Sequence, residues 1–182
     1  MTTADTNSDT TTLRVDNLVV DIPLAAGVLH AVRGISFYVE QGETLCIVGE
    51  SGCGKSLTSL ALMNLLPAKA VRTADRIELS GADLRPMNER EMSDLRGKKM
   101  AMIFQEPMTS LNPAYTIGNQ LEEAVVRHQK ISRTQARERA IHLLERVGIT
   151  AAASLLRQDP HQLSGGLRQR VMIAMALMCG SD

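Results

Sequence analysis

The residues Gly49-Glu-Ser-Gly-Cys-Gly-Lys-Ser56 match the pattern G-x-x-x-x-G-K-[ST] without a mismatch. They follow an apolar run, Thr44–Val48, and open a helical stretch that we expect from Lys55 to about Leu66, before Pro67. Glycines let the backbone curl so that successive N–H groups point inward, and the positive end of the helix dipole adds to them. The stretch therefore predicts a loop that binds the phosphates of a nucleotide.

Two side chains of this loop have expected roles in chemistry. Lys55 should reach the β- and γ-phosphates, and the Ser56 hydroxyl should ligate Mg²⁺. The alternative is a Gly-rich turn that happens to precede a helix, which seldom reproduces the whole pattern together with both flanks. Cys53 invites a redox role, but a small residue tolerated in a tight loop is the simpler interpretation, since no resolving cysteine lies nearby in the sequence.

Composition bounds the class of protein. The chain has 182 residues, of which 44% are hydrophobic, so it is globular, with one domain or one domain and a subdomain. Lys+Arg and Asp+Glu both number 20, and this balance argues against a general nucleic-acid binder. The longest apolar run, Val171–Cys179, is too short to span a bilayer, so we expect membrane association only through a partner. An odd number of cysteines, 3, favours a reduced cytoplasm.

Alternation and short apolar runs predict strands before the helical part. The expected strands are 13–20, Ile35–Val39, Thr44–Val48, Ile77–Leu79 and Met100–Phe104. Thr44–Val48 is apolar at four successive positions, which suits a parallel strand buried on both faces, and Met100–Phe104 is again an apolar run.

Helices dominate the rest of the chain. A short one is expected at Asn88–Arg96, most of 117–147 should be helical, and a last helix should run over Leu167–Cys179. Ser132 and Gln135 match a capping box. The apolar face that should follow it comprises Ala136, Ala140, Leu143, Leu144 and Val147, before Gly148 ends the helix.

Two further segments carry polar groups where these could contact a nucleotide or its metal ion. Gln105 ends the apolar run 100–104, where its side-chain oxygen could meet Mg²⁺ or an attacking water; the alternative is a polar residue at a strand end. Ser164, Gly165 and Gly166 precede the last helix, and a capping hydroxyl with free N–H groups at a helix start predicts a second anion site. An ordinary helix start remains the alternative.

Together these residues resemble the nucleotide-binding subunits of ABC transporters. Gly49–Ser56 is similar to the Walker A motif, Gln105 to the Q-loop, and Leu163–Gly166 to the signature motif. The resemblance covers roughly residues 13–182 and is strongest to ATPases of dipeptide, oligopeptide and nickel importers. It implies an α/β fold, with a P-loop NTPase core, an N-terminal antiparallel β part and an inserted helical subdomain. The implied divisions are a disordered tail (1–12), the ATP-binding core (13–106) and the helical subdomain (107–182).

The resemblance also implies a function with named partners. The expected function is ATP-driven uptake of peptides or a related small solute, with ATP and Mg²⁺ as cofactors, at the cytoplasmic face of the cell membrane. Implied partners are two integral-membrane permease subunits, a second and distinct ATPase subunit whose signature serine clamps the ATP, and indirectly a solute-binding protein, with no nucleic acid. The implied catalytic residues are Lys55 and Gln105, and the implied metal ligands are Ser56 and Gln105. The residues expected to bind nucleotide are Leu29, Gly49, Glu50, Ser51, Gly52, Cys53, Gly54, Lys55, Ser56, Ser164, Gly165 and Gly166.

Two departures from the family pattern bear on the function. The family usually stacks the adenine on an aromatic ring, whereas this chain offers Leu29 and the imidazole of His30. The Walker B strand, which in the family carries an Asp for Mg²⁺ and a catalytic Glu, should follow Asp182, so we expect the chain to be a piece of a longer product. Residues 1–182 alone should then turn over ATP negligibly and expose apolar strand edges. Two alternatives remain: a naturally short, non-catalytic ATP-binding or dimerising module, and a soluble ABC ATPase that does not transport.

Overall fold

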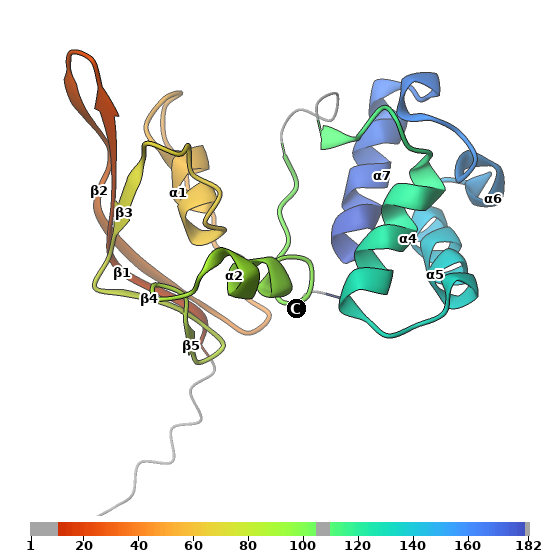
Figure 1. The fold of residues 1–182 in the computed structure, drawn as a ribbon, viewed down its shortest axis with the longest axis horizontal. Coiled ribbons are helices and arrows are strands. Elements are labelled where there is room, and N and C mark those ends of the chain that lie inside the picture. Colours follow the sequence, from red (N-terminus) through yellow and green to blue (C-terminus); the bar gives the residue numbers. More distant parts are fainter. Residues whose placement is uncertain (1–10, 105–109, 181–182) are drawn as a thin grey trace, which may run out of the picture. The chain divides into compact units, whose positions relative to one another are not determined.

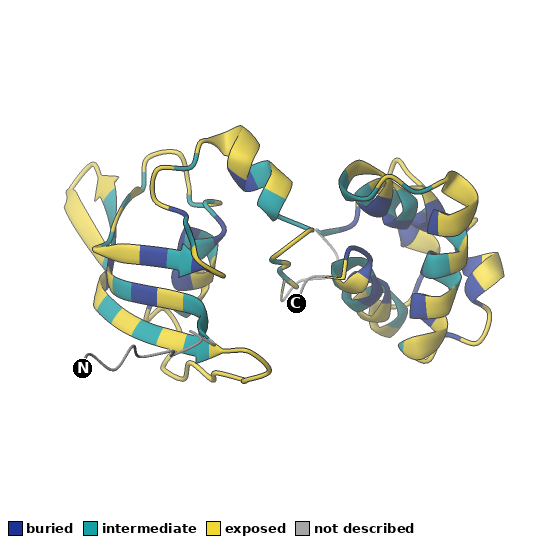
Figure 2. Cartoon of the chain, turned by 90° about the horizontal axis from the view of Figure 1, so that it is seen from below, coloured by how far each residue is buried: buried dark blue, intermediate teal, exposed yellow. Residues whose placement is uncertain are grey.

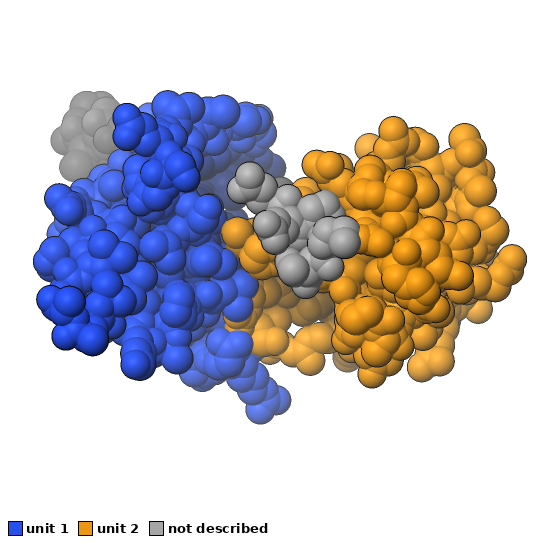
Figure 3. Space-filling model, turned by 90° about the horizontal axis from the view of Figure 1, so that it is seen from above, with its two compact units in different colours: residues 1–92 blue, residues 93–182 orange. Residues whose placement is uncertain are grey.

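The chain folds into two compact units, residues 1–92 and 93–182, which Figure 3 shows in different colours. The structure is a computed structural model that describes residues 11–104 and 110–180. Each unit has a core of its own, and each contains one of the two segments for which the sequence predicts an anion site.

The first unit is built on an antiparallel sheet (Figure 1). Its strands are β1 (Thr11–Leu24), β2 (Gly27–Glu40), β3 (Val71–Thr73), β4 (Arg76–Leu79) and β5 (Ala82–Asp83). The order is β2-β1-β4-β5, and β3 also pairs with β1. The three strands predicted within 13–20, 35–39 and 77–79 are confirmed, although β1 and β2 are much longer than expected and β3 and β5 were not predicted.

Helix α1 (Lys55–Leu62) contributes Thr58 and Ala61 to the core of this unit. The strands contribute four fully buried side chains, which are Val15, Leu18, Val20 and Ile77. The helix is shorter than predicted. It ends before Pro67 because Asn64 adopts a left-handed conformation (φ 54°) and the N–H of Leu65 bonds back to the carbonyl of Leu60.

The prediction of a buried parallel strand at Thr44–Val48 is wrong for this structure. The segment forms no strand, and Leu45, Ile47 and Val48 are 42%, 46% and 88% exposed. A strand exists only when a neighbour takes its backbone hydrogen bonds, and every named strand pair among residues 11–104 and 110–180 is antiparallel and excludes this segment.

The second unit is helical (Figure 1). Its elements are the end of α2 (Glu89–Leu95), α4 (Ile117–His128), α5 (Arg133–Arg146), α6 (Ala152–Leu155), the 3₁₀ turn η1 (Pro160–Gln162) and α7 (Gly165–Leu177). Helices α4, α5 and α7 surround one apolar core, and Figure 2 shows their buried residues in dark blue. The core includes Leu121, Leu144 and Val171, which are all fully buried.

The local signals predicted for α5 are confirmed. The Ser132 hydroxyl accepts a hydrogen bond from the N–H of Gln135, and the side-chain oxygen of Gln135 accepts one from the N–H of Ser132. Ala136, Ala140, Leu143 and Leu144 are buried, Val147 packs against them, and Gly148 ends the helix at a φ of 83°. The last helix begins at Gly165, two residues earlier than predicted, because Ser164 caps it.

The strand predicted at Met100–Phe104 is likewise wrong. Among the described residues, the only β-pairing of Met100 is an isolated bridge to Arg96, and Ile103 and Phe104 are 47% and 44% exposed. The apolar run would need strands on either side, and the described part of the chain offers it none.

His128, at the end of α4, makes the stability of this unit depend on pH. Burial is the main reason that its pKa is lowered, and Arg127 and Lys98 lower it further against the opposing effect of Asp94. Because the folded chain binds this proton more weakly, the free energy of unfolding should fall as pH drops below the ordinary value of 6.5 and level off below the lowered pKa. Urea unfolding across this range should show this fall as a step in wild type. The control His142→Gln should show the same step, because the side chain of His142 is exposed. A step that persists in His128→Gln would contradict the assignment.

Candidate functional site

The loop Gly49–Ser56 is folded around the ammonium group of Lys55. The Lys55 Nζ donates hydrogen bonds to the carbonyl oxygens of Gly49 at 2.7 Å and Glu50 at 2.6 Å, and to the Sγ of Cys53 at 3.4 Å. The loop is also tight, because a Cβ added at Gly49 would lie 2.6 Å from that Sγ. The lysine ammonium is therefore already turned back over its own loop.

The loop fits an anion at the start of α1. The N–H of Thr58 bonds to the carbonyl of Gly54, so the three preceding N–H groups, at 55–57, lie in the first turn without a helical acceptor. Gly54 is the N-cap, and it has no side chain that could accept a hydrogen bond from these N–H groups. The exposed Ser56 lies in the same turn. Free N–H groups, a helix dipole and an ammonium suit a triphosphate, and a hydroxyl beside them suits the Mg²⁺ that accompanies it.

A β-bulge fixes the loop from the other side. Val20 pairs with Val32 and Asp21 with His30, so Ala31 is an extra residue in β2. The Ala31 carbonyl oxygen lies so close to Gly54, whose φ is 95°, that a Cβ there would be 2.3 Å from it. Only glycine fits this position. The sequence did not reveal this contact, because nothing in the local pattern marks Ala31 as a bulge.

A largely aliphatic pocket adjoins the loop. It is lined by residues of β2, of the segment before the loop, of the loop itself and of α1: Leu29, His30, Ala31, Val32, Arg33, Ile35, Ile47, Val48, Gly52, Cys53, Lys55, Leu57 and Thr58. Leu29 is 47% exposed. The imidazole of His30 bonds through Nδ1 to Asp21 at 2.8 Å. The structure thus places Leu29 in one pocket with residues of the loop, and Asp21 fixes the imidazole of His30, the only ring among the lining residues.

The second predicted anion site starts α7 in the other unit. Ser164 caps the helix, with its Oγ accepting from the N–H of Leu167 at 3.4 Å. Gly165 and Gly166 are exposed, and a Cβ at either would meet nothing within 4 Å. The first turn of α7 is therefore open to an incoming group. Gln105 lies outside the described residues.

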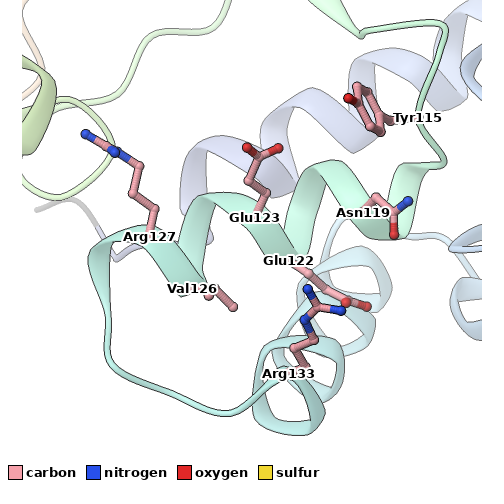
Figure 4. A pocket seen from close by; sticks show the side chains of 7 residues that line it. All are labelled: Tyr115, Asn119, Glu122, Glu123, Val126, Arg127 and Arg133. Atoms are coloured by element: carbon pink, nitrogen blue, oxygen red, sulfur yellow. The ribbon is translucent and has the colours of Figure 1, made fainter.

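A shallow hollow on α4 was not predicted (Figure 4). Its lining residues are Tyr115, Asn119, Glu122, Glu123, Val126, Arg127 and Arg133. Tyr115 and Val126 are 54% and 42% exposed, and charged side chains of both signs surround them.

Among the described residues no group of acidic, histidine or cysteine side chains could hold a metal ion, and none of the described helices is long and apolar enough to cross a membrane.

Comparison with known proteins places these features in a family. The dipeptide transport ATP-binding protein DppD of Bacillus subtilis is 49% identical over 93% of this chain and 51% of its own length. The oligopeptide transport ATP-binding protein OppD of the same organism is 48% identical over 91% of this chain and 46% of its own length. The glutathione import ATP-binding protein GsiA of Escherichia coli is 49% identical over 92% of this chain. The chain thus spans about half the length, or less, of these curated relatives.

Solved structures identify the fold. The ATP-binding cassette MJ0796, a dimer in a post-hydrolysis state bound to ADP and Pi, superposes with a TM-score of 0.82 at 23% identity, over 93% of this chain and 70% of that one. This likeness confirms the predicted α/β fold of the P-loop NTPase class. The sequence pattern of the family described as "ABC transporter" matches residues 32–182. The chain therefore belongs to the ABC transporter family.

Proposed function

We propose that this chain is the ATP-binding part of an importer subunit, which couples ATP binding and hydrolysis to the uptake of peptides or a related small solute. The observation that carries the proposal is the loop Gly49–Ser56, with the Lys55 ammonium turned over it and uncapped N–H groups at the start of α1. The names of relatives at 48–49% identity, which are dipeptide and oligopeptide transport proteins, support the class of solute.

In this proposal the residues of the loop bind the triphosphate. The N–H groups of Gly52–Ser56 and the Lys55 ammonium take the phosphates, and the adenine lies against Leu29 in the adjoining pocket. Ser56 and Gln105 hold Mg²⁺, which supplies charge neutralisation for phosphoryl transfer. Gln105 orients the attacking water. The turnover of residues 1–182 alone, and their division into an ATP-binding part (13–106) and a helical part (107–182), stay predictions.

A second ATPase subunit completes the site in this proposal. The open first turn of α7, with Ser164, Gly165 and Gly166, grips the phosphates bound to the partner, and the partner's equivalent turn grips those bound here. The dimeric state of MJ0796 supports the arrangement. This arrangement gives a role to the second predicted anion site, because the loop Gly49–Ser56 is enough to bind the chain's own nucleotide.

We place the permease subunits on the hollow of α4. Exposed Tyr115 and Val126 give apolar contact at its surface, and the charges around them give a polar rim, as in transient interfaces. Docking there would hold the protein at the cytoplasmic face of the membrane, with the solute-binding protein contacting only the permease. The balance of 20 basic and 20 acidic residues favours this over a nucleic-acid partner.

Purification of the complete gene product from detergent-solubilised membranes tests the proposal. Two integral-membrane proteins should copurify with wild type and with Tyr38→Ala, whose ring is 60% exposed in the other unit. Tyr115→Ala should copurify with much less of them, because it removes an aromatic contact from the docking surface. Equal recovery with both tyrosine variants would reject the docking site. Copurification with ribosomes or DNA would instead support the soluble alternative.

A further inference from the structure

Arg168, one turn into α7, reaches back over the start of its own helix. Its Nε donates to the carbonyl oxygen of Pro160 at 2.8 Å, and its Nη2 donates to that of His161 at 3.4 Å. The side chain is half-buried. Helical side chains lean toward the N-terminus, which puts this guanidinium beside the segment that leads into Ser164.

The segment before Ser164 is held at several points. The side-chain oxygen of Gln162 accepts from the N–H of Asp159 at 2.8 Å, and Leu163 is buried in the core. The cap itself is weak, because the Ser164 Oγ lies 3.4 Å from the N–H of Leu167. The position of Ser164 therefore depends on how Pro160–Leu163 is fixed, and Arg168 ties this turn to α7 through its two hydrogen bonds.

The charge of Arg168 is in an unfavourable place for the helix alone. A cation in the first turns opposes the helix dipole, and α7 has no acidic residue in its first turn to offset it. The helix dipole thus does not account for a guanidinium at this position, whereas its hydrogen bonds to the carbonyl oxygens of Pro160 and His161 do.

We propose that Arg168 is a positioning residue, which holds Ser164 and the N–H groups of Gly165 and Gly166 in the orientation that accepts the triphosphate of a partner subunit. The inference rests on the proposed function. It means that binding of the partner's nucleotide by the turn Ser164–Gly166 depends on a residue outside that turn. The support needs a guanidinium, because its planar fork bonds two carbonyl oxygens at once, whereas a lysine ammonium is a point charge on a flexible stem.

Arg170 provides a matched control on the same helix. Its Nη1 donates to the carbonyl oxygen of Gly148 at 2.7 Å, at the end of α5 and away from the turn at Pro160–Leu163. Arg170→Lys and Arg168→Lys therefore make the same chemical change two residues apart and keep the charge. Only the second should disturb Ser164.

The experiment uses the complete gene product with its partner subunits. We expect Arg168→Lys to lower kcat about tenfold or more, to weaken ATP-dependent association of the ATPase subunits, and to leave the ATP affinity of its own loop within about twofold. Arg170→Lys should keep kcat within about twofold of wild type. Thermal unfolding of each variant is measured first, and all assays are run well below the lowest midpoint, so that a loss of stability does not enter the comparison.

Two results would overturn the inference. One is an unchanged kcat and unchanged association in Arg168→Lys, and the other is an equal loss in both arginine variants. Failure of the proposed function looks different, since wild type itself would then neither bind ATP nor associate when ATP is added.

Discussion

Lys55→Ala is expected to abolish high-affinity ATP binding by the complete gene product. The ammonium now donates to two carbonyl oxygens of its own loop, and ATP would replace these with phosphate oxygens. Charge-assisted hydrogen bonds contribute about 1.5–3 kcal/mol each, so the loss of two predicts a fall in affinity of roughly a hundredfold or more. Isothermal titration calorimetry with magnesium and ATP measures this directly.

Lys69→Ala is the control for this prediction. Lys69 is exposed in the same unit and outside the loop, so its removal subtracts the same charge without touching the site. It should bind ATP as wild type does. Equal affinities for Lys55→Ala and wild type would mean that the loop does not hold the phosphates.

Gly54→Ala is expected to disrupt the loop and lower the stability of the protein. The backbone at Gly54 has a φ of 95°, which costs other residues about 1–2 kcal/mol, and the new Cβ would lie 2.3 Å from the Ala31 carbonyl oxygen. Since that oxygen is backbone and cannot rotate away, either β2 or α1 must shift. The free energy of unfolding in urea should fall by about 3 kcal/mol or more, and ATP binding should be lost with it.

Gly52→Ala separates the two causes within the same loop. Its φ of 82° is also left-handed, but an added Cβ would meet nothing within 4 Å. It should therefore show only the backbone cost, about 1–2 kcal/mol. If both alanine variants lose the same stability, the contact between Ala31 and Gly54 does not constrain the loop.

The helical unit could be predicted well because its signals are local. The capping box at Ser132 and Gln135, the apolar face of α5 and the glycine stop at Gly148 all lie within one helix and its flanks. Such features depend on neighbours three or four residues away, which a single sequence displays. The early end of α1 could not be predicted in the same way, because it depends on the left-handed backbone of Asn64, which the sequence does not show.

The strands show the opposite case. Thr44–Val48 and Met100–Phe104 have the composition of buried parallel strands, yet neither is a strand here. Whether such a run pairs is decided by segments far away in the sequence, and the described residues supply no strand beside either. The pairing of the short β3 and β5 was hidden for the same reason.

The candidate site likewise has features that the sequence shows and contacts that it does not show. The pattern of Gly49–Ser56 and the serine at the start of α7 could be read directly, because each is a short stretch with its own geometry. The approach of Ala31 to Gly54 and the reach of Arg168 to Pro160 could not, since both depend on how separate segments fold against each other.

A crystal structure of the complete gene product with magnesium and a non-hydrolysable ATP analogue shows directly where the triphosphate binds. We predict the terminal phosphates within hydrogen-bonding distance of the Lys55 Nζ and of the N–H groups at the start of α1, and, where two ATPase subunits meet, against the serine turn of α7. A nucleotide bound elsewhere, with the Lys55 Nζ still bonded to Gly49 and Glu50, would contradict the account.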